Sequence, residues 1–206
     1  MKSLSIISAA LVAYVSAAAT TVFPSAAGAT AVSAPVAVSG TCEGGMKRLS
    51  GNNGCNAGEG SSADAAFTAA SGGTLQNVII GSAQTEGVHC TGPCTIRNVW
   101  WGDVCEDALT VKQTSGTSYV IGGGAKGASD KVIQRNGGGT VSVTDFGQDF
   151  GKLYRSCGIN TNYGDTATIS NTCTSSVTDI CQRYTGSNSG DEPVKTGAGN
   201  DGTYCK

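Results

Sequence analysis

The stretches Thr74-Leu75-Gln76-Asn77-Val78 and Thr95-Ile96-Arg97-Asn98-Val99 repeat one order of residue types 21 residues apart, and Thr140-Val141-Ser142-Val143 begins similarly. A second series of short apolar runs contains Val88, Leu109, Val132 and Leu153, spaced by 21, 23 and 21 residues. Short strands that recur as ordered blocks predict a solenoid, in which each coil buries its apolar face against the next. A β-sandwich would also space its strands evenly, but the recurrence of whole blocks favours the solenoid.

The composition agrees with a chain of strands and turns. Glycine is abundant (31 residues), proline is scarce (4 residues), and β-branched runs alternate with Gly, Asn and Asp. This is the chemistry of short strands joined by tight turns. Asn77 and Asn98 hold the same place in their repeats, so stacked coils could join their side chains in an amide ladder.

The N-terminus has the features of a secretory signal peptide: a charged start at Lys2, an apolar stretch from Leu4 to Val15, and small residues up to Ala19. The stretch is too short and wrongly flanked for a membrane anchor. We therefore expect a signal peptide over residues 1–18 and one secreted domain over 19–206. The domain core would span about residues 22–184, followed by a polar tail that is coil from Gly186 and pinned by Cys205. Residues 20–41 would be either a linker or the first strand of the domain.

All nine cysteines follow the signal peptide. In an exported protein they predict a disulfide framework. Cys90 and Cys94, with His89 adjacent, also have a possible zinc-ligand spacing. Residues 42–64 look like a glycine-rich loop closed by Cys42 and Cys55. Because the number of cysteines is odd, we expect one thiol to stay unpaired or to pair between chains.

Acidic residues gather on two neighbouring repeats, although the net charge of −2 gives no field that would recruit nucleic acid. If Val88, Leu109, Val132 and Leu153 form one stacked column, Glu86 and Asp107 lie on adjacent coils about 4.8 Å apart. Glu106 lies beside Asp107, and three carboxylates this close repel one another without a counter-charge. A hard cation with irregular oxygen coordination, Ca²⁺ rather than Mg²⁺, would relieve the repulsion. Otherwise the acids would fan out into solvent, or calcium would only stabilise the fold.

Basic residues follow on the next two repeats. The same alignment stacks Lys131 on Lys152 and points both outward beside the acids, while Arg155 follows three residues later. An acidic half that holds calcium beside a cationic half suits β-elimination on a polyuronate. Calcium would bind the C6 carboxylate and acidify the C5 proton, a neutral lysine would remove it, and nearby cations would stabilise the enolate. Two carboxylates would also suit a hydrolase, but the adjacent lysines favour elimination.

Several blocks of the chain together resemble the family 3 pectate lyases of plant-associated microbes. The resemblance covers about residues 22–184 and is carried by Asn77–Gly81, Glu86–Cys90, Asn98–Trp101, Asp103–Ala108, Gly122–Lys131 and Asp149–Gly158. It implies an all-β, single-domain, right-handed parallel β-helix. It also implies a secreted enzyme, expected to be monomeric, that cleaves de-esterified homogalacturonan (pectate, or polygalacturonate) by calcium-dependent β-elimination to 4,5-unsaturated oligogalacturonates.

The resemblance also assigns site residues. It places the calcium ligands on Glu86, Glu106 and Asp107, and the catalytic cations on Lys131, Lys152 and Arg155, with Lys131 as the base. A further glutamate of the family's cleft corresponds to Glu59, whose loop aligns poorly.

The chain departs from the family pattern after Ser156-Cys157-Gly158, which joins directly to Ile159–Asp165. About one coil is therefore missing, and with it a cysteine that follows the one matching Cys157, which makes Cys157 the expected orphan thiol. Solenoids lose whole coils more readily than parts of coils. The alternative function is a catalytically impaired, pectate-binding β-helix or secreted effector, and a defective gene model would give the same junction.

The remaining motifs predict structural roles. The glycine-rich segment Gly122–Ser129 lacks the Gly-Lys-Ser/Thr order of a P-loop and is read as a tight turn of the coil. His89, the single histidine, is expected to be buried and hydrogen-bonded rather than to act as a base. Trp100 and Trp101 are adjacent on a strand, so at most one of them could stack on sugars.

Overall fold

The computed structural model describes residues 19–51, 54–55, 58, 60–128, 131–160, 164–186 and 193–206, with the backbone alone over 148–152 and 154–160. The predicted signal peptide (residues 1–18) and Glu59 lie outside the described residues. No helix in the described ranges is long and apolar enough to cross a membrane.

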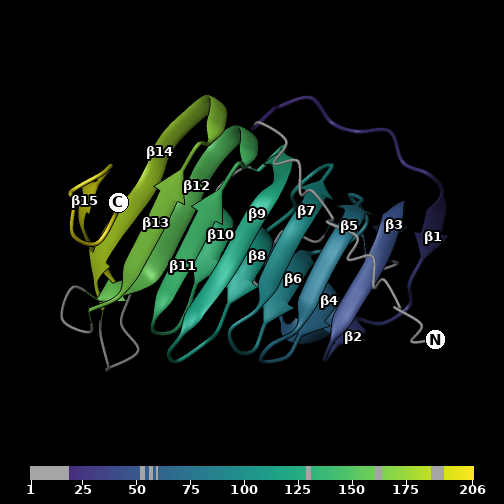
Figure 1. Ribbon diagram of the computed structural model, residues 1–206, viewed down its shortest axis with the longest axis horizontal. Helices are drawn as coiled ribbons and strands as arrows, with labels where there is room; N and C mark the ends of the chain where they lie inside the picture. Colours follow the sequence, from purple (N-terminus) through teal and green to yellow (C-terminus); the bar gives the residue numbers. More distant parts are fainter. Residues whose placement is uncertain are drawn as a thin grey trace, which may run out of the picture.

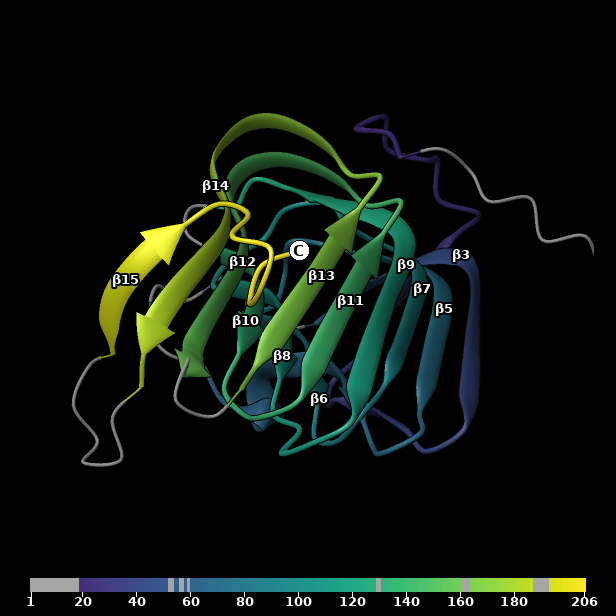
Figure 2. The same cartoon turned by 60° about the vertical axis from the view of Figure 1, so that its left-hand side comes forward.

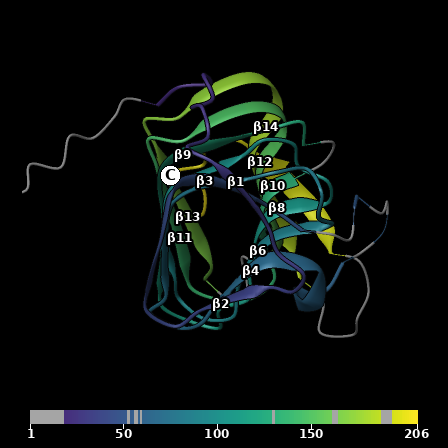
Figure 3. The ribbon, with the colours of Figure 1, turned by 90° about the vertical axis from the view of Figure 1, so that its right-hand side faces the viewer.

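The strands of the described chain form one hydrogen-bonded sheet that winds around itself as a parallel β-solenoid (Figure 1). Seen from the β1 end, the strands run around a central core (Figure 3). The prediction of an all-β parallel β-helix is confirmed. Among the described pairs, the antiparallel one joins β14 to β15 at the C-terminal end of the stack (Figure 2).

The short strands on one side of the solenoid are β2 (Val36–Val38), β4 (Ala65–Ala69), β6 (Glu86–Cys90), β8 (Asp107–Val111) and β10 (Lys131–Arg135). The longer strands, which bend from one side to another, are β3 (Thr41–Ser50), β5 (Thr74–Ile80), β7 (Thr95–Trp101), β9 (Thr117–Lys126), β12 (Gly147–Asn160) and β14 (Cys173–Thr185). The others are β1 (Ala29–Ala31), β11 (Thr140–Thr144), β13 (Thr166–Ser170), β15 (Val194–Ala198) and a 3₁₀ turn, η1 (Ser62–Asp64). Residues 20–41 thus contain two strands rather than a linker, and the tail predicted as coil contains β15.

The corners of successive coils are aligned by asparagines. Asn77 and Asn98 both have a left-handed backbone, with φ of 55° and 49°, which lets each long strand turn sharply. The Asn98 side-chain amide donates to Asn77 Oδ1 at 2.8 Å, and Asn77 donates in turn to Glu43 Oε2 at 2.8 Å. The predicted amide ladder is therefore present. Its side-chain hydrogen bonds help to fix the alignment of neighbouring coils, in addition to the hydrogen bonds between the strand backbones.

The core is made of stacked apolar side chains from successive coils. One column consists of Leu75, Ile96, Val120 and Val143, which lie directly opposite one another on β5, β7, β9 and β11 and are almost fully buried. Burying side chains of this size contributes roughly 1.5–3 kcal/mol each relative to exposure. Because each coil has this apolar interior, the side chains on its outside are positioned by the same stacking.

The alignment predicted from Val88, Leu109, Val132 and Leu153 is wrong across one step. Val88 lies opposite Leu109 as predicted, but Leu109 lies opposite Ile133 rather than Val132. The coil between β8 and β10 is one residue longer than the repeat suggested, so Lys131, not Asp130, lies opposite Asp107. A shift of one residue exchanges the two faces of a strand. Lys131 therefore belongs to the same column as the acids.

Three disulfides occur in the described chain: Cys55–Cys105, Cys90–Cys94 and Cys181–Cys205. The Cys90–Cys94 bond decides for a disulfide over a zinc site, and Cys205 pins the tail as predicted. The prediction of a loop closed by Cys42 and Cys55 is wrong, because Cys55 bonds Cys105 and Thr41–Ser50 is a strand. The expectation of a single leftover thiol is also wrong, because within the described part of the chain both Cys42 and Cys173 are unpaired. The side chain of Cys157 lies outside the described residues.

The asparagine ladder gives a first testable prediction. Asn98→Ala removes the hydrogen bond to Asn77. It also puts alanine, whose side chain cannot hydrogen-bond the nearby backbone, in a left-handed conformation that alanine disfavours. Together these changes should lower the free energy of unfolding by about 1–3 kcal/mol. Asn98→Gly loses the same hydrogen bond but tolerates the backbone conformation, so it should be less destabilised. Urea unfolding of the three proteins checks this, and an Asn98→Ala protein as stable as wild type would contradict it.

Candidate active site

One column of side chains crosses the strands β6, β8 and β10. The parallel register places Glu86 opposite Asp107, Asp107 opposite Lys131, and Lys131 opposite Lys152. Glu106 precedes β8 in a turn held by a hydrogen bond of 3.1 Å from its backbone amide to the Thr85 carbonyl. The strand register therefore places two acids and then two lysines at equivalent positions on four successive strands of the solenoid.

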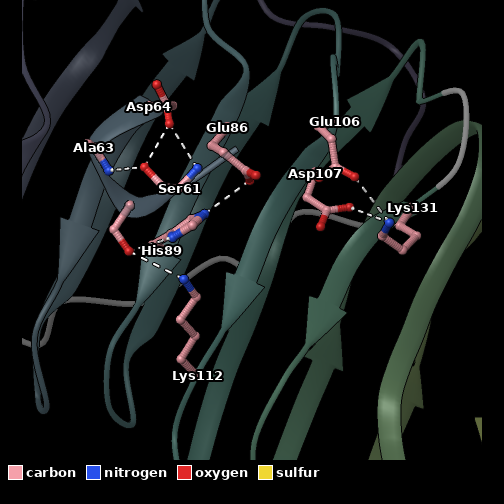
Figure 4. Close-up of polar contacts among 10 residues, drawn as sticks. Ser61, Ala63, Asp64, Glu86, His89, Glu106, Asp107, Lys112 and Lys131 are labelled. Atoms are coloured by element: carbon pink, nitrogen blue, oxygen red, sulfur yellow. Dashed lines mark hydrogen bonds and ion pairs between the residues drawn. The ribbon is translucent and has the colours of Figure 1, made fainter. Parts of the chain in front are cut away.

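The side chains of the column converge, as Figure 4 shows for Glu86, Glu106, Asp107 and Lys131. One carboxylate oxygen from each of Glu86, Glu106 and Asp107 lies within 4.8 Å of the others. Lys131 Nζ lies 3.3 Å from Glu106 Oε1 and 3.5 Å from Asp107 Oδ1. The three acids and the first lysine thus form a single cluster, termed the acid–lysine cluster below.

The cluster is largely withdrawn from water. Glu86, Asp107 and Lys131 are only 3%, 3% and 4% exposed, and Glu106 is half-buried. The pKa of the Asp107 carboxyl is raised from 3.8 to about 8, mainly because the group is buried. Lys131 opposes the increase, and the neighbouring Glu106 and Glu86 contribute to it. Buried carboxylates placed this close are stable in ionised form only with additional positive charge.

The residues present fit a divalent cation. Asp107 Oδ1 is fully buried and, among the described residues, accepts no hydrogen bond, with only the ion pair to Lys131 Nζ at 3.5 Å beside it. Together with the oxygens of Glu86 and Glu106 it forms an all-oxygen donor set. Hard cations such as Ca²⁺ take such sets of carboxylate oxygens in flexible geometry.

A turn beside the cluster supports Glu86. His89 Nε2 lies 3.0 Å from Glu86 Oε2, and His89 Nδ1 lies 2.9 Å from Ser62 Oγ in η1. The backbone of Gly60 packs so closely that a Cβ there would lie 2.5 Å from Glu86 Cγ. The disulfide Cys55–Cys105 ties this part of the chain to the turn that precedes Glu106. The loop and the strands that carry the acid–lysine cluster are thereby held together.

The other predicted site residues are placed less fully. The backbone sets Lys152 opposite Lys131 and Arg155 opposite Gln134, while their side chains lie outside the described residues. His89 is buried and hydrogen-bonded, as predicted. Neither tryptophan is an open platform for sugars, because Trp100 and Trp101 are 6% and 2% exposed and the Phe23 ring packs edge-on against Trp100.

Ser62 and Lys112 were not assigned to this site from the sequence. Lys112 Nζ donates to Ser62 Oγ at 3.4 Å. A local signal for the first exists. Ser61 and Asp64 form a capping box, in which the Ser61 hydroxyl accepts from Ala63 N and Asp64 accepts from Ser61 N. This Ser-x-x-Asp pattern predicts a short helical turn. It does not predict which strand the turn covers.

Comparison with known proteins identifies the family. The sequence model of the family described as "Pectate lyase" matches residues 20–159 and 158–191. The chain belongs to the pectate lyase family. Its members are polysaccharide lyases, so the chain is assigned as an enzyme of this class. The two matched segments of this pectate lyase meet where the sequence predicts the missing coil.

Named relatives and solved structures agree with the family. The chain is 49% identical to "Probable pectate lyase E" of Neosartorya fischeri, over 85% of this chain and 80% of the relative. It is 50% identical to "Pectate lyase H" of Emericella nidulans, over 80% of this chain and 74% of the relative. The catalytic domain of pectate lyase PelI from Erwinia chrysanthemi has a similar structure, with a TM-score of 0.63 and 26% identity over 87% of this chain and 94% of that domain.

The raised pKa of Asp107 predicts how the stability of this pectate lyase depends on pH in a chelating buffer. The folded protein binds the Asp107 proton more tightly than the unfolded chain. The contribution of this proton to the free energy of unfolding is therefore fully present below pH 3.8 and is lost as the pH rises towards about 8. Relative to Asp107→Asn, which keeps the shape but does not titrate, the wild-type melting temperature should fall by roughly 10 °C between pH 5 and pH 8.

Thermal unfolding of both proteins in chelator across this pH range makes the measurement. A wild-type melting temperature that stays constant or rises relative to Asp107→Asn would show that the carboxyl is ionised throughout.

Proposed function

We propose that this protein is a secreted, calcium-dependent pectate lyase that cleaves de-esterified homogalacturonan to 4,5-unsaturated oligogalacturonates. The observation that carries the proposal is the acid–lysine cluster, in which Lys131 Nζ lies 3.3 Å and 3.5 Å from two carboxylates of a possible metal site. Family membership supports the reaction class. A solved PelI structure in complex with tetragalacturonic acid, 27% identical and with a TM-score of 0.58, supports the substrate class.

Lys131 is assigned the role of base. In the neutral form its Nζ takes the C5 proton of a galacturonate unit, and the electrons of that bond form the C4–C5 double bond. The C4–O bond breaks, and its electron pair leaves on the oxygen, which is protonated as it is released. Because a lysine accepts a proton only when neutral, we expect the activity to increase on the alkaline side of neutrality.

Glu86, Glu106 and Asp107 are assigned to hold calcium. When bound, calcium would engage the C6 carboxylate of the substrate and increase the acidity of the C5 proton beside Lys131. Lys152 continues the column one strand further. We assign Lys152 and Arg155 to bind substrate carboxylates and to stabilise the developing enolate. Glu59 is proposed for the same cleft from the family resemblance alone.

Removal of the base should separate turnover from metal binding. Lys131→Ala should lower kcat about 10²–10⁴-fold, the usual contribution of a positioned base. Its calcium affinity should be unchanged or higher, because Lys131 competes with the metal for Glu106 and Asp107. The ultraviolet absorbance of the unsaturated product reports turnover, and calorimetry reports calcium binding. Lys126→Ala, which removes an exposed lysine outside the cluster, is the matched control. Near-normal turnover by Lys131→Ala would exclude the base assignment.

Loss of a metal ligand should affect both properties together. Asp107→Ala removes a buried carboxylate of the donor set and should weaken calcium binding at least tenfold, with a parallel loss of activity that added calcium restores in part. The same absorbance and calorimetry assays apply. Unchanged calcium affinity in Asp107→Ala would place the metal elsewhere.

The alternative is a β-helix that binds pectate without cleaving it, motivated by the missing coil after Cys157. The cluster of Glu86, Asp107 and Lys131 lies on β6, β8 and β10, ahead of that junction. A nearest-neighbour stack can keep these coils intact when a later one is lost. Folded wild-type protein that binds polygalacturonate in calcium but releases no unsaturated product would establish the alternative.

A further inference from the structure

The only histidine of the chain links the acid–lysine cluster to a second group of polar residues. His89 is 1% exposed and uses both ring nitrogens: Nε2 lies 3.0 Å from Glu86 Oε2 and Nδ1 lies 2.9 Å from Ser62 Oγ. Ser62 in turn lies 3.4 Å from Lys112 Nζ. Figure 4 labels His89 between Lys112 and Glu86, with the dashed line from His89 to Glu86.

The donors and acceptors in this chain favour one direction. A lysine ammonium group can only donate, so Ser62 Oγ accepts from Lys112. The Ser62 hydroxyl keeps a proton that it can donate to His89 Nδ1, and Nε2 needs a proton to hydrogen-bond Glu86 Oε2. The imidazole with its proton on Nε2 meets both conditions. With the proton on Nδ1 instead, Nε2 would face the carboxylate oxygen with no proton between them.

We propose that His89 is a positioning residue: Lys112 and Ser62 hold it in the Nε2–H tautomer, and it donates to Glu86 Oε2 so that the other carboxylate oxygen faces Glu106 and Asp107. The inference deepens the proposed function, because it rests on Glu86 being a calcium ligand. Partners outside the ligand set typically change metal affinity 10–100-fold through such hydrogen bonds.

The surroundings are built to hold this geometry. Ser62 belongs to the η1 turn, whose capping box joins Ser61 to Asp64 through hydrogen bonds of 2.7 Å and 2.9 Å. His89 lies opposite Thr68 and Thr110 on the neighbouring strands, so no charged residue of the adjacent coils stacks directly on it. Gly60 packs against Glu86 from the same loop and leaves the carboxylate little room to turn away.

The test uses two variants of His89 that differ in which nitrogen they imitate. The amide of Gln extends about as far as Nε2 and can still donate to Glu86, whereas the shorter Asn reaches only the place of Nδ1. Calcium affinity is measured by calorimetry without substrate. His89→Gln should remain within about threefold of wild type, and His89→Asn should bind calcium at least tenfold more weakly. Equal calcium affinities in the two variants would overturn the proposal.

A second measurement is decided on the wild-type protein, so its outcome does not require a variant to fold or calcium to bind. Because the chain has one histidine, the ¹⁵N signals of its imidazole in the chelated wild-type protein, made without a histidine tag, can be assigned directly. At about pH 8 we expect a protonated Nε2 and an unprotonated Nδ1. Ser62→Ala should give a mixture of tautomers. A proton on Nδ1 in the wild-type protein would overturn the proposal.

The two measurements separate this inference from the proposed function. If wild-type protein binds no calcium, the calcium role fails, and the tautomer still decides whether Ser62 and Lys112 orient His89. If wild-type protein binds calcium and both His89 variants bind it equally, the calcium role stands and the positioning role is excluded.

Discussion

Hydrogen bonds between parallel strands hold neighbouring coils about 4.8 Å apart, and they set both the core and the site of this molecule. The same ladder that stacks Val88 on Leu109 also stacks Glu86 on Asp107. Isolated acids of this kind would separate in water. Here the buried apolar columns fix their backbones, and the side chains have to share one small volume with Lys131. The free-energy cost of keeping these carboxylates ionised is greatest at Asp107, whose pKa is raised to about 8, mainly by burial.

The repulsion between these carboxylates is the physical basis of the proposed calcium site. A site whose carboxylates are already crowded has a strong tendency to bind a divalent cation, and a lysine in the same column lies next to any ligand of that cation. The acids and Lys131 come from three successive strands of one sheet, so little chain movement is needed to assemble them. The support of Glu86 by His89 extends this preorganisation beyond the ligands themselves.

Much of this arrangement could be predicted from the sequence, because the repeat of 21 residues is constant between Asn77 and Asn98 and between Glu86 and Asp107. The next step could not, since the coil before Lys131 is longer and the apolar run Val132-Ile133 fits a core column with either residue inward. The disulfide partners could not be predicted from the sequence either. Cys55 bonds Cys105, 50 residues away, although Cys42 is nearer in the sequence. The contact of Ser62 and Lys112 with His89 depends on how a loop folds over a strand, which no periodicity records.

The most direct test of the whole account is a crystal structure of the wild-type protein grown with calcium. The account predicts a strongly scattering ion bound at about 2.3–2.6 Å by oxygens of Glu86, Glu106 and Asp107, with Lys131 adjacent to its open side. An ion bound elsewhere, or these acids turned away from one another with calcium present in excess, would contradict it.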